Sequence, residues 1–268
     1  MTIPIQHMSL EDLVALVDER RDALRTFIDW AEHRETTNRS MYLANRRDIL
    51  DAGQAAAMYP EEWWGVVVFT CFGTLNSTHA VLGVLAKPVD PGAEKLLLSV
   101  DFIGPKVGNH RKRPGLGGAK TALIEACQNS SLLHKILHGQ GNFHDRYQCL
   151  LAAKMDQWGR TTCFDLLVRA GALGIGGQHY QPEIAYLAES TGPKAGFCAV
   201  WGRDVTTATA RWCEGLLQAW HRHWTEVVDR VGARWSGRPY GPGDLENALC
   251  IYQEGSNGGP SCEAGGGR

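Results

Sequence analysis

Hydrophobic residues recur every three or four positions through most of the chain, which is the spacing of one face of an amphipathic helix. The stretch from Ser9 to Asp12 has the composition of a helix start, and apolar residues follow at helical spacing to about His33. A second helix is expected over 47–57. The run Trp63 to Phe72 is apolar on every side, and the preceding Pro60-Glu61-Glu62 favours a buried helix over a buried strand.

The same spacing predicts helices in the second half of the chain. They are expected over 119–128, 131–138, 143–157, Thr161–Ala170, Pro182–Ala188, Lys194–Trp201, Val205–Val231 and Asp244–Tyr252. Asp244 is expected to cap the last of these helices. Because no internal repeat and no convincing alternation of polar and apolar residues occurs, the sequence predicts an all-α fold.

A chain of 268 residues fits one large domain or two small ones. We expect a single helical domain over 1–254, with the alternative of two helical lobes, about 1–103 with 205–254, and 119–204. The Gly-rich end, 255–268, is expected to be disordered. Hydrophobic residues make up 44% of the chain, which is enough for a sizeable core, and a net charge of -2 does not by itself indicate a nucleic-acid partner. Any basic surface is therefore local.

The eight cysteines are scattered singly and form no Cys-x-x-Cys pair. Buried reduced thiols therefore fit them better than disulfides or a structural zinc site, and no metal site is expected. The first residues do not have the pattern of a secretion signal, and no apolar run approaches the roughly 20 residues of a membrane span. These observations predict a soluble cytoplasmic protein with no membrane partner.

The most unusual stretch of the chain is Gly104–Lys120, which combines five glycines with a cluster of cationic residues. Its glycines make a stable helix unexpected there. Arg111, Lys112 and Arg113 could neutralise DNA phosphates, and a solvated flexible loop explains them equally well. The stretch lacks the Gly-Lys-Ser/Thr of an ATP-binding loop, so ATP hydrolysis is not expected.

A short turn joins the two helices predicted over Pro182–Ala188 and Lys194–Trp201. Gly192 can adopt a positive φ in this turn, and Pro193 suits a first helical position. The free backbone N–H groups at the start of the second helix, together with Lys194, would then form a site for an anion such as a DNA phosphate. The candidate DNA contacts are Ser190, Thr191, Gly192 and Lys194. A plain connection between two helices is the alternative.

This turn resembles the hairpin of the helix-hairpin-helix DNA glycosylase superfamily, whose usual form is Leu-Pro-Gly-Val-Gly-x-Lys-Thr-Ala. Glu189 and Ser190 stand where that form has its proline and its first glycine. The resemblance implies a DNA-glycosylase-like helical fold. In those glycosylases a catalytic Asp follows the second glycine at a longer distance than Asp204 follows Gly192 here, so the resemblance does not imply cleavage of a glycosidic bond.

Three segments, Gln157–Leu167, Ser190–Gly196 and Asp244–Cys250, occur in an order that is similar to a narrower group. They resemble the α-glutamyl/putrescinyl thymine pyrophosphorylases, glycosylase-derived phage proteins that are also called amino acid:DNA transferases. The segment Phe27–Glu35 also resembles the N-terminal helix of their relatives, which include the helical hydroxymethyluracil DNA kinases. If the protein is encoded by a phage, it would act in the cytoplasm of the host.

The resemblance implies a transferase that acts on double-stranded DNA. Its substrate would be a thymine whose methyl carbon carries a pyrophosphate, and a small amine, such as an amino acid or a polyamine, would replace the pyrophosphate. Such a reaction needs cationic groups or helix N-termini at the leaving group, a carboxylate or His as base, and extrusion of the modified base from the duplex. No organic cofactor is implied, and whether a divalent metal holds the pyrophosphate stays open.

Two candidate residues for this chemistry lie in the first of the three segments. Arg160 stands just before a predicted helix and could face the pyrophosphate, or it could pair with Asp156 or Asp165 at the surface. Asp165 could be the base or orient the amine, and an ordinary solvated helix charge is the alternative.

The other two candidates are Asp204 and Glu246. Asp204 could be the base, or it could cap the helix expected from Val205. Glu246 and Asp244 could simply stabilise the dipole of the last helix, and the resemblance favours Glu246 as a catalytic residue. A DNA glycosylase or base-repair enzyme, a non-catalytic helix-hairpin-helix DNA-binding protein, and a helical protein with no role on DNA are the competing hypotheses.

Overall fold

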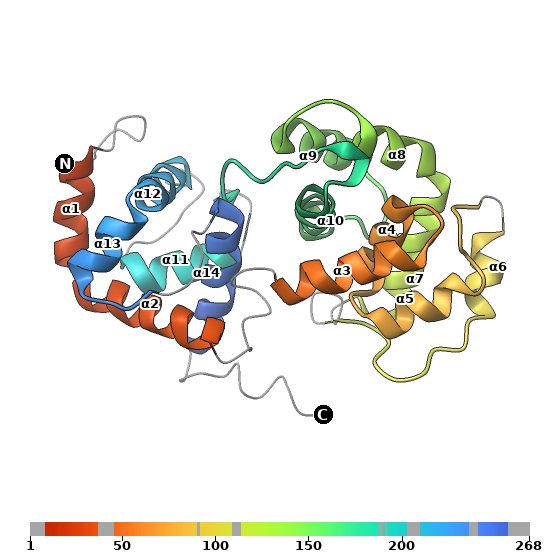
Figure 1. Cartoon of the computed structure of the whole chain (residues 1–268), viewed down its shortest axis with the longest axis horizontal. Helices are drawn as coiled ribbons and strands as arrows, with labels where there is room; N and C mark the ends of the chain where they lie inside the picture. Colours follow the sequence, from red (N-terminus) through yellow and green to blue (C-terminus); the bar gives the residue numbers. More distant parts are fainter. Residues whose placement is uncertain are drawn as a thin grey trace. The chain divides into compact units, whose positions relative to one another are not determined.

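The protein is built from α-helices joined by turns and short extended segments (Figure 1). The computed structural model describes residues 9–36, 46–89, 92–108, 114–187, 190, 192–202, 210–235 and 241–256. No strand occurs in these parts of the chain, and the all-α prediction is confirmed.

Two compact units divide the chain between them. Unit 1 combines Met1–Arg47 with Pro182–Arg268, and unit 2 is the continuous stretch Asp48–Gln181. The sequence suggested lobe boundaries near residues 103, 119 and 204, whereas the units change over at 47/48 and 181/182. The chain therefore leaves unit 1 after its second helix and completes that unit only after unit 2 has been built.

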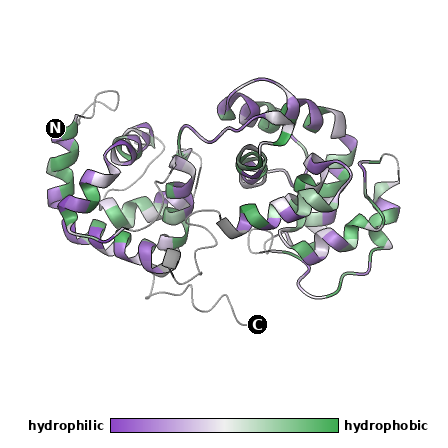
Figure 2. Cartoon of the chain, in the orientation of Figure 1, coloured by the Kyte–Doolittle hydropathy of each residue, from purple (hydrophilic) through white to green (hydrophobic). Residues whose placement is uncertain are grey.

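Six helices form the described part of unit 1. They are α1 (Leu10–Glu19), α2 (Arg21–Thr36), α11 (Gly192–Trp201), α12 (Ala210–Arg222), α13 (Trp224–Val231) and α14 (Pro242–Ser256). The predicted start at Ser9 is confirmed as a capping box: the Asp12 N–H donates to Ser9 Oγ, and the Ser9 N–H donates to Asp12 Oδ2, each at 3.1 Å. Hydrophobic and hydrophilic residues both occur along these helices, as an amphipathic pattern requires (Figure 2).

Two predicted long helices of unit 1 are each broken into two. The helix expected to run to about His33 stops at Arg20, whose guanidinium donates to the carbonyl of Val200, at 3.1 and 3.2 Å, near the end of α11. The helix expected over Val205–Val231 is interrupted at His223, and its first residues lie outside the described part of the chain. Both breaks let successive short helices pack on the same core.

The core of unit 1 is rich in aromatic side chains. The Phe27 ring lies 5.5 Å from Trp220 and 5.1 Å from Tyr252, and Trp220 in turn lies 5.3 Å from both Trp201 and Trp224. Trp220 and Trp224 are buried, as expected for core residues. Burying a large apolar side chain contributes about 1.5–3 kcal/mol, so this cluster is a main source of the stability of unit 1.

Unit 2 contains the remaining described helices. They are α3 (Arg46–Met58), whose first two residues belong to unit 1, α4 (Glu62–Phe72), α5 (Leu75–Leu82), α6 (Ala93–Leu98), α7 (Gly115–Gln128), α8 (Ser130–His138), α9 (Phe143–Ala152), α10 (Arg160–Leu173) and the 3₁₀ turn η3 (Ile175–Gly177). The prediction of a buried helix over the apolar run is confirmed, because every residue of α4 from Trp63 to Phe72 is buried.

Some of the predictions for unit 2 were wrong. Residues Gly115–Lys120 of the Gly-rich stretch are helical, because they form the first turns of α7, which buries Ala119, Ala122 and Leu123. Burial of that face outweighs the poor helix propensity of the glycines. The helix expected to reach residue 157 ends at Ala152, and α6 was not predicted.

A buried arginine ties three helices of unit 2 together. The Arg169 side chain of α10 is 3% exposed and donates to both carboxylate oxygens of Asp48 in α3, at 2.7 and 3.0 Å, and to Thr70 Oγ1 in α4 at 3.1 Å. Asp165 lies 3.7 Å away on the same helix. Burial lowers the pKa of Arg169, but the two carboxylates outweigh that effect and leave its pKa raised. The guanidinium therefore stays charged and fully paired.

Helices α3 and α4 approach closely at Gly65, where an added Cβ would lie 2.4 Å from the carbonyl oxygen of Ala55. We expect Gly65→Ala to lower the free energy of unfolding by about 1–3 kcal/mol, as overpacking does in a rigid core. Gly117→Ala in α7 is the matched control, because nothing lies within 4 Å of its Cβ position. Ala is the better helix former, so this control should stabilise by up to about 1 kcal/mol. Urea unfolding followed by circular dichroism measures both, and equal midpoints for Gly65→Ala and the wild type would contradict the close approach.

Candidate functional site

The residues singled out in the sequence fall into three groups. Unit 1 holds Ser190, Gly192, Lys194 and Glu246. Unit 2 holds Arg160 and Asp165. Five candidates, Thr191, Asp204, Arg111, Lys112 and Arg113, lie outside the described residues. A site can therefore be built from the structure only within one unit at a time.

In unit 1, the first turns of α11 pack directly on the backbone of α14, which α11 crosses in Figure 1. An added Cβ at Gly196 would lie 1.9 Å from the carbonyl oxygen of Leu249, and one at Gly192 would lie 2.6 Å from Cys250 Sγ. Glycines four residues apart thus form a flat face that lets the two backbones touch. The glycines of the Gly192–Gly196 segment serve this contact, a role that their spacing of four could have suggested.

The predicted first helix of the hairpin is not present. Residues 182–187 form bends and a single 3₁₀ position instead of an α-helix. The prediction of a helix before the turn at Gly192 is therefore wrong for these residues. The second helix is confirmed and begins at Gly192, two residues earlier than expected. Residues 182–187 thus form an irregular segment, and its polar contacts differ from those of a hairpin.

This segment is held by Glu214 of α12. The Glu214 carboxylate accepts hydrogen bonds from the backbone N–H groups of Ala185, at 3.0 Å, and of Leu187. Between them, Tyr186 is buried with a φ of 52°, in the left-handed region that a bulky residue rarely adopts. Ser190 Oγ donates to the Leu187 carbonyl at 3.2 Å. Glu214 thus fixes the backbone of residues 185–187, a role that no pattern in the sequence indicates.

The first turn of α14 is a second polar feature of unit 1. The helix begins at Pro242, so Asp244 is its third residue and not the cap that was predicted. Its carboxylate accepts a hydrogen bond from the Gly241 N–H at 3.0 Å, which still satisfies a backbone donor at the helix start. Glu246 is only partly buried and stands four residues before Cys250, so it lies on the face of α14 that meets the first turn of α11.

These features define the α11–α14 site: the first turn of α11 with Gly192 and Lys194, and the first turns of α14 with Glu246. Lys194 is partly exposed, two positions after the glycine that contacts α14. The N-terminal end of α11 carries the positive end of the helix dipole, and Glu246 supplies a carboxylate. The site therefore combines groups that can hold an anion with a group that can accept a proton.

In unit 2, the helix predicted from Thr161 begins one residue earlier, so Arg160 is the first residue of α10 and does not precede it. Asp165 has a side chain that is only 14% exposed and lies 3.7 Å from Arg169. The alternative of an ordinary solvated charge is therefore wrong for Asp165. Asp165 is instead a largely buried carboxylate that faces a buried guanidinium.

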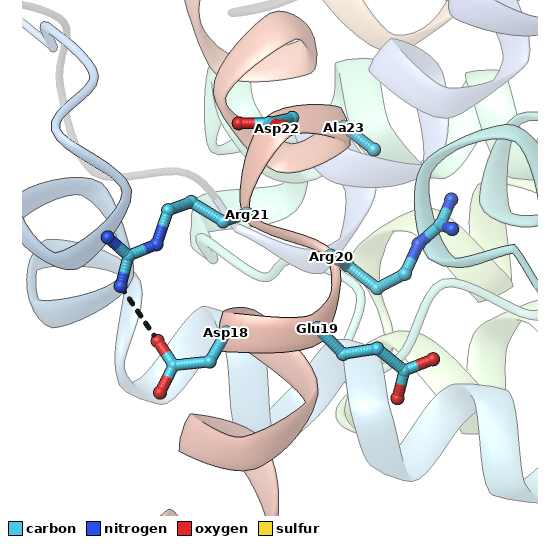
Figure 3. Close-up of a pocket in the computed structure, with 6 residues that line it drawn as sticks. All are labelled: Asp18, Glu19, Arg20, Arg21, Asp22 and Ala23. Atoms are coloured by element: carbon cyan, nitrogen blue, oxygen red, sulfur yellow. Dashed lines mark hydrogen bonds and ion pairs between the residues drawn. The ribbon is translucent and has the colours of Figure 1, made fainter.

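A depression of about 410 Å³ lies at the turn between α1 and α2, lined by Asp18 to Ala23 (Figure 3). Asp18 is bound by Arg21 at 3.0 Å and by Arg230, whose Nε donates at 3.0 Å. These hydrogen bonds, the one from Arg230 foremost, lower the pKa of Asp18. Figure 3 shows Arg20 extending away from this pair, toward its backbone partner in α11. Asp18, Arg20 and Arg21 thus already form hydrogen bonds within the protein.

The described residues contain no group of three or more His, Cys, Asp and Glu side chains placed to hold a metal ion. The seven cysteines among them form no disulfide with one another. No helix in the described ranges is long and apolar enough to span a membrane.

No protein-family model matches the chain, and no curated protein or solved structure is significantly similar to it. A function must therefore be argued from the three sequence segments and from the geometry of each unit.

The Glu214 contacts predict a pH dependence of stability. Burial raises the pKa of Glu214 above its ordinary value of 4.5, and the two backbone hydrogen bonds only partly oppose this shift. The folded protein then binds this proton more tightly than the unfolded chain does, so the free energy of unfolding should fall as pH rises from about 4.5 through the raised pKa.

Glu214→Gln should remove this decline from the pH profile measured by urea unfolding, whereas Glu183→Gln, at an exposed carboxyl in the same unit, should leave it. A Glu214→Gln profile with the wild-type slope over that range would contradict the assignment.

Proposed function

We propose that the protein is a DNA-modifying transferase that replaces the pyrophosphate of pyrophosphorylated 5-hydroxymethyluracil in DNA with a small amine. One observation carries the proposal. Two of the three segments that resemble the amino acid:DNA transferases, Ser190–Gly196 and Asp244–Cys250, come together in unit 1 through the contact of α11 with α14. Segments that share one chemistry should meet in space, and these two do.

The proposed reaction is a substitution at the carbon attached to the pyrimidine ring. The lone pair of the amine nitrogen forms a bond to the methylene carbon, the carbon–oxygen bond to pyrophosphate breaks, and the nitrogen loses a proton. Pyrophosphate leaves with additional negative charge, which the N–H groups at the start of α11 and the ammonium of Lys194 stabilise. The base is extruded from the duplex before reaction, because its reacting carbon must enter the site.

Glu246 is the proton acceptor in this proposal. Its carboxylate lies on the face of α14 that meets α11, and it belongs to one of the segments that resemble the family. Asp165 is less suited, because its side chain is only 14% exposed and is paired with the buried Arg169. Arg160, in the segment Gln157–Leu167, lies in unit 2, so no role in the α11–α14 site is proposed for it.

Nucleoside mass spectrometry tests the reaction. DNA that contains pyrophosphorylated 5-hydroxymethyluracil is incubated with the protein and a panel of amino acids and polyamines, and the digest is examined for amine adducts while pyrophosphate is assayed. We expect one class of amine to give a heavier nucleoside with stoichiometric release of pyrophosphate. Glu246→Gln should lower the rate by about 10²–10⁴-fold, as the loss of a general base does. Glu183→Gln, an exposed carboxyl in the same unit, is the control and should leave the rate unchanged.

The other outcomes separate the competing hypotheses. Abasic sites in the treated DNA would identify a glycosylase. Salt-sensitive binding with an unchanged nucleoside profile would identify a non-catalytic DNA-binding protein. No adduct and no pyrophosphate with any amine of the panel would refute the transferase.

A charge reversal tests whether the start of α11 contacts DNA. Lys194→Glu should weaken binding to duplex DNA and reduce the salt dependence of the binding constant by about one phosphate contact. Lys95→Glu, an exposed lysine on α6 of unit 2, is the control for a change in net charge alone. Fluorescence anisotropy with a labelled duplex at several salt concentrations measures both, and equal affinities for the two variants would argue against this contact.

A further inference from the structure

Helix α8 presents two histidines on one face. His134 and His138 are four residues apart, and their rings stack with centroids 4.0 Å apart and an angle of 14° between their planes. Both rings stand at right angles to the indole of Trp63 in α4, at centroid distances of 5.4 and 6.4 Å. Trp63 is buried, and its N–H donates to Glu61 at 2.7 Å. The two imidazoles therefore lie beside the same buried indole, which its hydrogen bond to Glu61 holds in place.

The hydrogen bonding of His138 fixes which of its nitrogens is available. Its Nδ1 lies 3.0 Å from the carbonyl oxygen of His134. A carbonyl can only accept a hydrogen bond, so Nδ1 carries the proton and the lone pair of the neutral ring is on Nε2. A ring N–H that donates to a backbone carbonyl while the other nitrogen is left for a ligand is the usual arrangement of a metal-binding histidine.

One metal ion can bind a nitrogen atom of each ring only if the two nitrogens lie at a suitable distance from each other. Two metal–nitrogen bonds of about 2.0–2.1 Å at a tetrahedral angle hold their nitrogens about 3.3 Å apart. In the stack the ring centroids are 4.0 Å apart and the planes differ by 14°, so each ring must turn about its side-chain bonds before its nitrogen lone pair points at a common ion. His134 is exposed and His138 is partly exposed, so an ion can reach both. Histidines at positions i and i+4 of a helix also provide two ligands of known metal motifs.

We propose that His134 and His138 form a binding site for a divalent transition metal, with water at the remaining coordination positions. Imidazole ligands favour Zn²⁺, Ni²⁺ and Cu²⁺ over Mg²⁺ and Ca²⁺, which prefer oxygen. No third His, Cys, Asp or Glu among the described residues completes the coordination, so the ion keeps open positions. The site belongs to unit 2 and does not depend on the proposed transferase activity.

Equilibrium dialysis of the full, untagged chain with Zn²⁺, Ni²⁺ or Cu²⁺ in a non-coordinating buffer tests the proposal. Cu²⁺ should bind most tightly, and Mg²⁺ should not compete. His134→Ala and His138→Ala should each lower the affinity for the metal by about 100-fold, because each removes one arm of a two-point attachment, and the double variant should be little worse. His79→Ala is the matched control, since His79 is an exposed helical histidine of the same unit with Leu75 and Gly83 at the positions four residues away. It should bind like the wild type.

Thermal unfolding gives a second measurement. Added Zn²⁺ should raise the Tm of the wild type and of His79→Ala, and it should leave the Tm of His134→Gln and His138→Gln unchanged, because only a ligand bound to the folded state stabilises it. The glutamine variants keep a polar side chain at these positions and guard against loss of folding. Wild-type affinity in either single His→Ala variant, or an equal loss in His79→Ala, would overturn the proposal.

Discussion

The contact between the backbones of α11 and α14 is the constraint around which unit 1 is arranged. Gly196 has no side chain, and the Leu249 carbonyl occupies the space that a Cβ would need. The two helices therefore meet at a distance that no other residue at position 196 would permit. Phe197, Val200 and Trp201 then point from α11 into the aromatic core, while Leu245 and Leu249 do so from α14. The same contact joins the first turn of α11 to the face of α14 that carries Glu246, so the packing of the core and the position of the proposed site have a common origin.

In unit 2, buried arginine side chains hold helices together. A buried guanidinium, that of Arg169, binds Asp48 and Thr70 from two other helices. A second buried arginine, Arg146, donates to the carbonyls of Ile136 and Gly139 around the end of α8. A buried charge of this kind requires all of its partners, because removing one leaves the others unpaired in a medium of low dielectric constant. The two buried arginines of unit 2 thus serve its structure, and Asp165 contributes to the ion pair of one of them, Arg169.

Periodicity alone predicted most of the helices, because each buries one apolar face, and Ser9 and Pro60 marked their starts through local chemistry. Prediction from the sequence failed where a residue's structure depends on a contact with a segment far away along the chain. Nothing near Arg20 or His223 is a helix breaker, and both breaks follow from where the next helix packs. Gly192 was assigned to a turn and Gly196 was given no role, since the partner of both glycines, α14, begins fifty residues after Gly192. Glu214 was missed for the same reason, as its acceptor role depends on a segment nearly thirty residues earlier.

The division of unit 1 between the two ends of the chain has a consequence for its synthesis. Unit 2 is continuous from residue 48 to 181 and can fold as soon as it leaves the ribosome. The apolar faces of α1 and α2 emerge before it and have no partner until the helices from α11 to α14 are made. During that interval Leu13, Leu24 and Phe27 lack the core that covers them in the folded unit. The glycine face of α11 is likewise uncovered until α14 has been made. The nascent chain is therefore most vulnerable to aggregation at α1 and α2, and this exposure ends only when α14, the last of the described helices, has been made.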